Sequence, residues 1–494
     1  MKFRESAFVF AIAILAALAM PPQLAAQEHA RYKLIDLGTP GGPNSFPSDA
    51  GSGITILNNA GTVAGWGDTT TPDPNCPNDP FTSALDGSCL IAHAFRWQNG
   101  TLTDIGALPG VNSSAAVAIN AGGWVLGASG NGLTDPITGV QQVRAVLWKA
   151  NQPIDLGTAG GNIVLPQTLN NAGQVVGGFE NTTLDPFSLF GFPAQTRAFL
   201  WEKGAMRDIG TLGGPDAFAF SINERGQVAG MSYTNNTPNA TTGIPTLEPF
   251  LWENGKMISL GTLGGTIGGP TAPGAQGSVM INNRGQIIGT SNLAGDSATH
   301  AFVWENGVMR DLGTFGGVNS FPVWLNDVGE IVGEADLTGS AVTHLHHAFL
   351  WKGGVMTDLG TLGSTSHAEA VNSRGQVVGR SRLGAPSTIL QHAFLWEEDG
   401  PMLDLNTLIP AGSGWELIDA YNINDRGEIL VDAIPLGTPP VQTGQLGHVA
   451  LLVPCDGVAE DCESTAAAAI PAAASNARSA RLAQRFRVAG PHRD

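Results

Sequence analysis

A histidine recurs at one place of a motif, His-Ala-Phe or a close variant, that this 494-residue chain repeats along its length. The recurring side chains are His93, His300, His347, His392 and His448. An imidazole can bind a metal or carry a proton near neutral pH, so each is a candidate for chemistry. Single histidines spaced one per repeat are too far apart to share a metal, however, and Arg144, Arg197 and Glu248 replace histidine in sister repeats. We therefore predict a structural, hydrogen-bonding role for them.

An aspartate recurs in a second motif, Asp-Leu-Gly or Asp-Ile-Gly, and could serve as a general acid or base. Its positions are Asp36, Asp104, Asp155, Asp208, Asp311, Asp358 and Asp404. Ser259 stands at the equivalent place of one repeat, so the carboxylate is not required in every copy. Short polar side chains of this kind commonly bond nearby backbone groups. We predict that these aspartates bond the backbone or a neighbouring repeat.

Histidines cluster locally in the stretch from His344 to His347. In a strand, His344 and His346 would point to the same face, where a metal could bridge them. No third ligand is evident nearby, and the alternative is a pair of exposed loop histidines without a metal. The chain has neither a Cys-x2-Cys zinc pattern nor an Asp-rich calcium loop. We expect no cofactor.

Carboxylates between the repeated motifs are the remaining candidates for catalysis. No nucleophile elbow, phosphate-binding loop, Rossmann glycine set or zincin helix is present. Two carboxylates from different repeats could still cleave a glycosidic bond, and Asp185, Glu334 and Asp336 lie on expected connectors. Solvated loop charges explain them equally well. The catalytic alternative is therefore a polysaccharide-active hydrolase or lyase with carboxylates at a channel mouth, and we name no catalytic residue.

The repeats must position these side chains, and their spacing indicates the scaffold. An Ala-Phe-Leu-Trp-type segment ends, at intervals of 45 to 53 residues, at Trp97, Trp148, Trp201, Trp252, Trp304, Trp351 and Trp396. An Asn-x-x-Gly turn occurs eight times, starting at Asn58, Asn120, Asn170, Asn223, Asn282, Asn326, Asn372 and Asn424. Asn-Gly at Asn99, Asn254 and Asn306 predicts a tight hairpin later in the repeat. Each repeat thus has four segments of strand character and no helical period.

Four antiparallel strands in a repeat of this length predict one propeller blade. The predicted fold is all-β, an eight-bladed β-propeller of four-stranded antiparallel blades, with seven blades as the fallback if one repeat is degenerate. Residues 32–38 read as a fourth strand without its three predecessors, and residues 448–453 as a third strand without its successor. We predict that the N-terminal strand pairs with the C-terminal strand and closes the ring.

Strands that alternate in direction place the two tight turns of every blade on one face. The variable connectors and the blade-to-blade links share the opposite face, here called the connector face. The long connectors are residues 68–92, 130–142, 179–196, 233–247 and 334–346. Variable loops on a rigid scaffold are where many folds bind ligands. We predict ligand binding by Glu334 and Asp336 and by an apolar stretch of Phe187, Phe190 and Phe192, which could instead fold back onto the body.

The termini predict export. Residues 1–26 combine a basic start, a short apolar run and small residues, which is typical of a secretory signal peptide; the run is short for an uncleaved membrane anchor. Residues 27–454 would form the propeller, and residues 455–494 a Cys-containing junction and a disordered Ala/Arg-rich tail. We expect no stable membrane span after signal cleavage.

Cysteine and charge usage agree with export. Four cysteines allow three pairings, of which we favour the local pairs Cys76–Cys89 and Cys455–Cys462 for an oxidising compartment. The chain has 24 basic and 42 acidic side chains and a net charge of −18. Such an acidic surface repels phosphate backbones, so we expect no nucleic-acid partner. We expect a monomer.

The triplets at His300, His347 and His392, with the downstream Asp-Leu-Gly-Thr and Ile-Asn-x-x-Gly-Gln-Val-Val-Gly pattern, resemble the extracellular HAF-repeat family over residues 32–454. The last repeat departs from the pattern, with Leu452 for Trp and Val431 for Gly. The resemblance implies an exported repeat protein and brings no catalytic residues. We therefore predict a secreted, extracellular or periplasmic propeller that binds a glycan, a cell-envelope component or a protein on its connector face. A purely structural surface or matrix component is a third possibility.

Overall fold

The computed structural model describes residues 32–48, 53–74, 76, 88–110, 112–139, 141–189, 193–240, 242–268, 279–339, 345–385, 390–398, 400–438 and 447–455. The expected signal peptide, Phe190, Phe192, His344, Cys462 and the tail lie outside the described residues. Nowhere in the described ranges does the chain form a helix with the length and apolar character that a membrane span requires.

The described chain is almost entirely strand. One four-stranded sheet joins the two ends of the chain and contains β1 (Tyr32–Asp36), β31 (Trp415–Ile423), β32 (Ile429–Pro435) and β33 (His448–Pro454). A second contains β2 (Ser45–Phe46), β3 (Val63–Pro72), β4 (Leu90–Gln98) and β5 (Thr101–Gly106), and a third contains β6 (Ser114–Ile119), β7 (Val125–Thr134), β8 (Gln141–Lys149) and β9 (Gln152–Asp155). A fourth contains β10 (Val164–Leu169), β11 (Val175–Leu184), β12 (Ala194–Glu202) and β13 (Ala205–Asp208). A nine-stranded sheet contains β14 (Ala217–Ile222), β15 (Val228–Tyr233), β16 (Leu247–Glu253), β17 (Lys256–Ser259), β18 (Gly264–Gly268), β19 (Met280–Ile281), β20 (Ile287–Leu293), β21 (Thr299–Glu305) and β22 (Val308–Asp311). The last two sheets are β23 (Gly316–Leu325), β24 (Ile331–Leu337), β25 (His346–Lys352) and β26 (Val355–Asp358), and β27 (Ser366–Val371), β28 (Val377–Arg382), β29 (Gln391–Trp396) and β30 (Leu403–Asp404). Two short 3-10 helices, η1 (Ala294–Asp296) and η2 (Leu405–Thr407), complete the elements.

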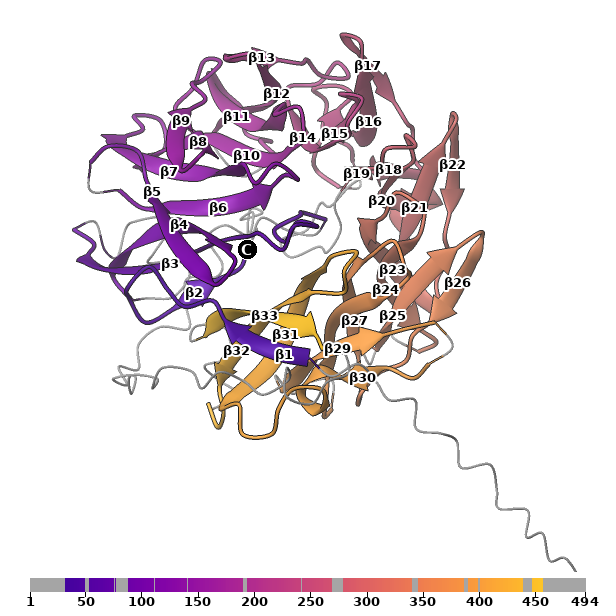
Figure 1. Ribbon diagram of the computed structural model, residues 1–494. Coiled ribbons are helices and arrows are strands. Elements are labelled where there is room, and N and C mark those ends of the chain that lie inside the picture. The colour runs from indigo at the N-terminus through magenta and orange to yellow at the C-terminus, as the bar shows by residue number, and fades with distance from the viewer. Residues whose placement is uncertain are drawn as a thin grey trace, which may run out of the picture.

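The sheets surround a common centre, with the chain passing from one sheet to the next around it (Figure 1). Neighbouring strands are antiparallel throughout, except where β16 and β18 of the nine-stranded sheet meet in parallel through Leu247 and Ile267. The prediction of an all-β fold built from four-stranded antiparallel sheets is confirmed. The predicted pairing of the terminal strands is also present, since β1 runs antiparallel to β33 from Tyr32 opposite Pro454 to Asp36 opposite Ala450.

The Asn-x-x-Gly turn joins the repeats to one another. In each turn the asparagine Oδ1 accepts backbone N–H groups of its own turn, as Asn282 does from Arg284 and Gln286, both at 3.0 Å. The Nδ2 atom donates instead to the backbone carbonyl of the asparagine that opens the next turn. The eight bonds run from Asn58 to Asn120, Asn170, Asn223, Asn282, Asn326, Asn372 and Asn424 and back to Asn58, at 3.0 to 3.2 Å.

These eight bonds form a closed cycle, because the last one returns from Asn424 to the first repeat at 3.1 Å. The asparagines that form it are buried. The sequence predicted the turn but not this bond between turns. The number of blades and the closure of the ring stay predictions, and the asparagine cycle supports both.

A cross-strand pair of glycine and phenylalanine forms the core of most sheets. Gly230 lies opposite Phe250 in the ladder, and a Cβ at Gly230 would come within 2.6 Å of the Phe250 ring. The ring therefore covers the glycine, and only hydrogen fits there. In the last repeat Val431 lies opposite Ala450, so the larger residue has moved to the other strand. Because the small Ala450 replaces the phenylalanine ring on one strand, Val431 can replace the glycine on the other.

The connectors are shorter than predicted. We expected them to begin at residues 68, 130, 179 and 334, but β3, β7, β11 and β24 continue to Pro72, Thr134, Leu184 and Leu337. Amide side chains that bond across the strands hold two of these extensions: Asn131 Nδ2 donates to Gln142 Oε1 and Asn181 Nδ2 to Gln195 Oε1, both at 2.9 Å. Polar composition suggested loops there, whereas the polar side chains pair across a hairpin.

Candidate functional site

Charged side chains occupy one strand position in three consecutive repeats. Eight residues after the turn asparagine, in the second strand of each repeat, the chain has Trp66, Ala128, Gly178, Met231, Thr290, Glu334, Arg380 and Asp432 in order. The first five cannot ionise and the last three can, although burial and the nearby Asp419 raise the pKa of Asp432 to about 8. A side chain that only maintains the repeated scaffold is expected to keep its type from one repeat to the next. The change to ionisable side chains at this position therefore indicates a functional site built on the fold.

The first strands of the same sector add further charges. His367 and Glu369 lie in β27, and Asp419 lies in β31. We call the set Glu334, His346, His367, Glu369, Arg380 and Asp419 the charged cluster. It spans three sheets, from β24 and β25 through β27 and β28 to β31.

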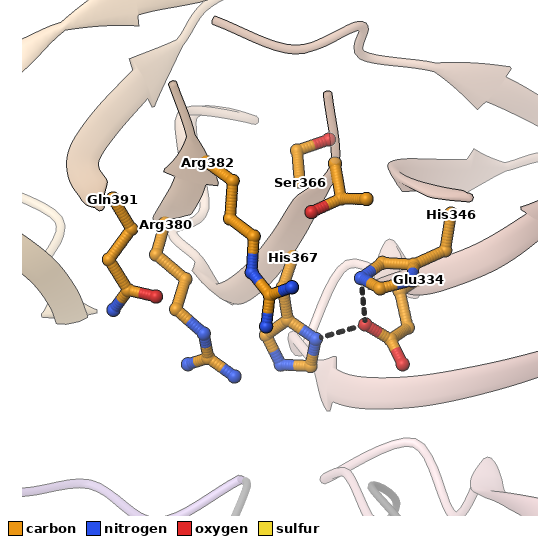
Figure 2. A pocket seen from close by; sticks show the side chains of 8 residues that line it. Glu334, His346, Ser366, His367, Arg380, Arg382 and Gln391 are labelled. Atoms are coloured by element: carbon orange, nitrogen blue, oxygen red, sulfur yellow. Dashed lines mark hydrogen bonds and ion pairs between the residues drawn. The ribbon is translucent and has the colours of Figure 1, made fainter. Parts of the chain in front are cut away.

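His367 is the centre of the charged cluster. Its Nδ1 lies 2.7 Å from Glu334 Oε2, and its Nε2 lies 3.2 Å from Glu369 Oε1. His346 also approaches Glu334, with 3.3 Å between its Nε2 and Oε2. Figure 2 shows both imidazoles converging on the Glu334 carboxylate from different strands. The His367 side chain is only 4% exposed, so these contacts are little screened by water.

Arg380 continues the charged cluster toward the next sheet. Its Nη1 pairs with Glu369 Oε1 and lies 2.9 Å from Asp419 Oδ2. One guanidinium thus bridges carboxylates from β27 and β31. Ion pairs that link neighbouring sheets in this way fix the sheets relative to each other as well as neutralising buried charge.

The pKa values of the central pair lie far from neutrality. Burial alone would raise the pKa of Glu334, but the charge and hydrogen bond of His367 and the charges of His346 and Arg380 lower it to about 2. Burial would lower the pKa of His367, but the Glu369 and Glu334 carboxylates raise it to about 9. Burial lowers the pKa of His346, which the Glu334 charge only partly offsets. At neutral pH Glu334 is therefore an anion, His367 a cation and His346 neutral.

A cavity of about 180 Å³ adjoins the charged cluster. Its lining consists of Glu334, His346, Thr365, Ser366, His367, Arg380, Arg382 and Gln391 (Figure 2). These residues lie at the strand ends beside the connectors: His346 begins β25, Arg382 ends β28 and Gln391 begins β29. The cavity is therefore on the connector face, between the sheet of β24 and the sheet of β28.

Glu334 and His367 are not suited to exchanging protons near neutral pH. An efficient general acid or base has a pKa near the working pH. The ion pair instead holds Glu334 and His367 in their charged forms across the neutral range. What the cavity offers is fixed charge and hydrogen-bonding groups in set positions.

Two of the predicted site residues line this cavity. Glu334 does, although it lies in β24 rather than on a connector, and so does His346. Asp336, also in β24, accepts bonds from the backbone N–H and side chain of Asn319 at 3.0 and 3.2 Å. It therefore holds its own sheet together. No group of three or more His, Cys, Asp or Glu side chains suited to a metal occurs among the described residues, and the predicted metal partner His344 lies outside them.

Phe187 folds back onto the body. It packs beside Met231, Tyr233 and Leu247, and the Tyr233 hydroxyl donates to its carbonyl at 3.0 Å. This is one of the two arrangements considered for the apolar connector. Phe190 and Phe192, the rest of the predicted contact patch, lie outside the described residues.

The recurring histidines and aspartates pair with each other. The pairs are His93–Asp104, His300–Asp311, His347–Asp358, His392–Asp404 and His448–Asp36, with Arg144–Asp155 and Arg197–Asp208 in two other repeats, at 2.7 to 3.2 Å. Each of these bonds joins the third and fourth strands of one sheet. Each aspartate also accepts the backbone N–H two residues further on, at 2.7 to 2.9 Å, so the predicted bond to the backbone is confirmed. Where Glu248 replaces histidine, Ser259 replaces aspartate and donates to it. The exchange of both partners together indicates a structural pair in every repeat.

One of the two predicted disulfides is confirmed, between Cys76 and Cys89. Cys455 is also disulfide-bonded. Its predicted partner Cys462 lies outside the described residues.

Sequence reasoning missed Glu369, Arg380, Arg382 and Asp419. It treated each repeat as a copy and looked for chemistry in connectors and motifs. An alignment of the eight repeats on their turn asparagines would have revealed Arg380, because its position has an uncharged side chain in the first five repeats, and Arg382, because no other repeat has a basic residue at its position.

No protein-family model matches the chain, and no curated protein matches it. Among solved structures it is similar to the β-propeller domain of the Trilobed protease from Pyrococcus furiosus, at 10% identity and a TM-score of 0.38 over 61% of this chain and 80% of that one. It is also similar to a puromycin-hydrolyzing peptidase of Mycobacterium tuberculosis, at 13% identity and 0.39 over 81% and 62%. TolB from Acinetobacter baumannii matches at 9% identity and 0.30 over 67% and 80%. The chain has an all-β, propeller-type fold, and likenesses this distant say nothing of its activity.

Proposed function

We propose that this protein is an exported propeller that binds a ligand in the cavity beside the charged cluster, without catalysing a reaction on it. The observation that supports this most directly is the change from uncharged side chains to Glu334 and Arg380 at one strand position in two consecutive repeats, since both of these residues line the cavity. Buried charges of this kind rarely improve stability over apolar packing. A scaffold would therefore not need them, whereas a binding site would.

The polar character of the cavity favours a polar ligand. At about 180 Å³ the cavity is smaller than the roughly 300–1,000 Å³ that drug-sized ligands fill. It would accept one sugar ring or a similar small group of a larger molecule. A glycan or another cell-envelope component that presents such a group on the connector face is the proposed ligand.

Export and family membership belong to the same proposal. The basic and apolar start of the chain, the Cys76–Cys89 disulfide and the HAF-type repeats all support a protein that works outside the cytoplasm. N-terminal sequencing of the protein after export tests this part: we expect the mature chain to begin at Gln27.

A thermal-shift screen of purified residues 27–494 tests the binding itself. A ligand that binds only the folded protein raises its melting temperature. We expect a shift with glycan or envelope fragments, and the loss of that shift when Arg382 in the cavity is changed to Gln. Arg284→Gln is the matched control, since Arg284 is exposed in the Asn282 turn and does not line the cavity. Turnover of a bound fragment would contradict the non-catalytic proposal and favour the hydrolase or lyase.

A further inference from the structure

We propose that the cavity recognises the carboxylate of an acidic sugar, a uronic acid or a sugar acid of similar size, with Arg382 as the main anchor and Glu334 as an acceptor for a ring hydroxyl. This deepens the proposed function and rests on it.

The lining itself indicates a hydroxyl-rich, charged ligand. Most ligand pockets are lined mainly by apolar and aromatic side chains with a few polar groups. All eight residues that line this cavity have polar or charged side chains. An apolar ligand would leave these groups without partners, which costs free energy, whereas a sugar can bond many of them.

The charge at the cavity is opposite to that of the protein as a whole. The chain has 42 acidic and 24 basic residues, yet Arg380 and Arg382 both line this one cavity. Ten residues after the turn asparagine, the eight repeats have Asp68, Gly130, Glu180, Tyr233, Asn292, Asp336, Arg382 and Ile434. A position that is acidic in three repeats is basic in only one, the repeat whose strand β28 lines the cavity.

Both arginines line the cavity from β28. Arg380 also pairs with Glu369 and Asp419 through its Nη1 atom. Arg382 is the last residue of β28, at the end of the strand beside the connector, and Figure 2 shows its side chain among the lining residues. A guanidinium can hold a carboxylate through two parallel N–H···O bonds. An anion that enters from the connector face therefore meets Arg382 before Arg380.

A carboxylate fits the cavity better than a phosphate. Glu334 is ionised and lines the same cavity, so it repels a dianion more than it repels a single negative charge. As a carboxylate it can also accept hydrogen bonds from ring hydroxyls. The pair of Arg382 and Glu334 thus matches a ring that has a carboxylate on one side and hydroxyls on the other.

Isothermal titration of purified residues 27–494 tests this inference, with galacturonate and glucuronate as probes and galactose, glucose and inorganic phosphate as comparisons. We expect a uronate to bind more tightly than its neutral hexose and more tightly than phosphate. Arg382→Gln should weaken uronate binding about tenfold or more, as removal of a hydrogen bond to a charged group typically does. Gln391→Glu is a second variant: it adds a negative charge to the lining and should weaken uronate binding while leaving the fold intact. Arg284→Gln should change nothing.

The outcomes separate this inference from the proposed function. If a neutral hexose or phosphate binds as well as the uronate, the inference is wrong and a binding function stands. If uronate binds but neither Arg382→Gln nor Gln391→Glu weakens it, the ligand lies elsewhere and the inference is wrong. If no sugar, acidic or neutral, binds to a protein that is folded by circular dichroism, both proposals are wrong.

Discussion

Replacing one asparagine of the cycle should destabilise the whole propeller. The Asn282 side chain makes four hydrogen bonds: its Oδ1 accepts from Arg284 and Gln286, and its Nδ2 donates to Gln286 Oε1 at 2.8 Å and to the Asn326 carbonyl at 3.0 Å. A buried hydrogen bond contributes a net of about 0.5–1.5 kcal/mol. Because Asn282 is only 4% exposed, water cannot replace these bonds. We expect Asn282→Ala to lower the free energy of unfolding by about 2–5 kcal/mol.

Asn282→Asp distinguishes the role of the Oδ1 atom, which accepts hydrogen bonds in the turn, from that of the Nδ2 atom, which donates to the next repeat. Aspartate keeps the acceptor for the turn but cannot donate to the Asn326 carbonyl, and it places a charge against that oxygen. It should therefore also destabilise the protein, although the turn is preserved. The matched control is Asn283→Ala, one residue further on. The Asn283 side chain also bonds to neighbouring repeats, through Glu224 and Asp327, but these bonds are exposed and water can replace them, so the change should cost less than about 1 kcal/mol. Urea unfolding measures all three variants. A loss for Asn282→Ala no larger than for Asn283→Ala would refute the role assigned to the cycle.

Three further predictions concern other parts of the molecule. Burial and the nearby Asp185 raise the pKa of the buried Asp216 to about 8. The folded state therefore keeps a proton that the unfolded state releases near pH 4, so stability falls as pH rises from about 4 to about 8 and then levels off. Asp185→Asn should raise the melting temperature relative to the wild type at pH 9, where Asp216 is charged, more than at pH 5. Ala450→Phe alone should overfill the last sheet and destabilise it by about 1–3 kcal/mol, and adding Val431→Gly should recover part of that loss in urea unfolding, because it restores the glycine–phenylalanine pair of the other repeats. Uronate affinity measured by titration should fall as pH rises through 9, where His367 loses its charge.

The scaffold was predictable because every repeat contains the same strand and turn motifs. Asn-x-x-Gly at Asn282 and Asn-Gly at Asn254 each determine a turn from neighbouring residues alone, and eight copies remove the ambiguity of any one. The structure has the positive φ that such a hairpin needs, 53° at Asn254. The terminal strand pairing was predictable for the same reason, since each end lacks what the other supplies.

The site was less predictable, because it depends on contacts between sheets. Glu334 and His367 are 33 residues apart in sequence and belong to different sheets, yet they lie 2.7 Å apart. Patterns in the neighbouring sequence indicate neither the ion pair that keeps these two groups charged nor the fact that they are buried. The same limit hid the asparagine cycle: the amide was correctly read as part of a turn, and its second partner lies in the next repeat, 44 residues on for Asn282.

The most direct test of the account is a crystal structure of the protein soaked with a uronate that binds in titration. The account predicts the sugar in the cavity, with its carboxylate about 2.7–2.9 Å from the Arg382 guanidinium and a ring hydroxyl bonded to Glu334. A uronate bound to another part of the surface, with the cavity empty, would contradict the claim that the polar and charged residues lining this cavity form the binding site.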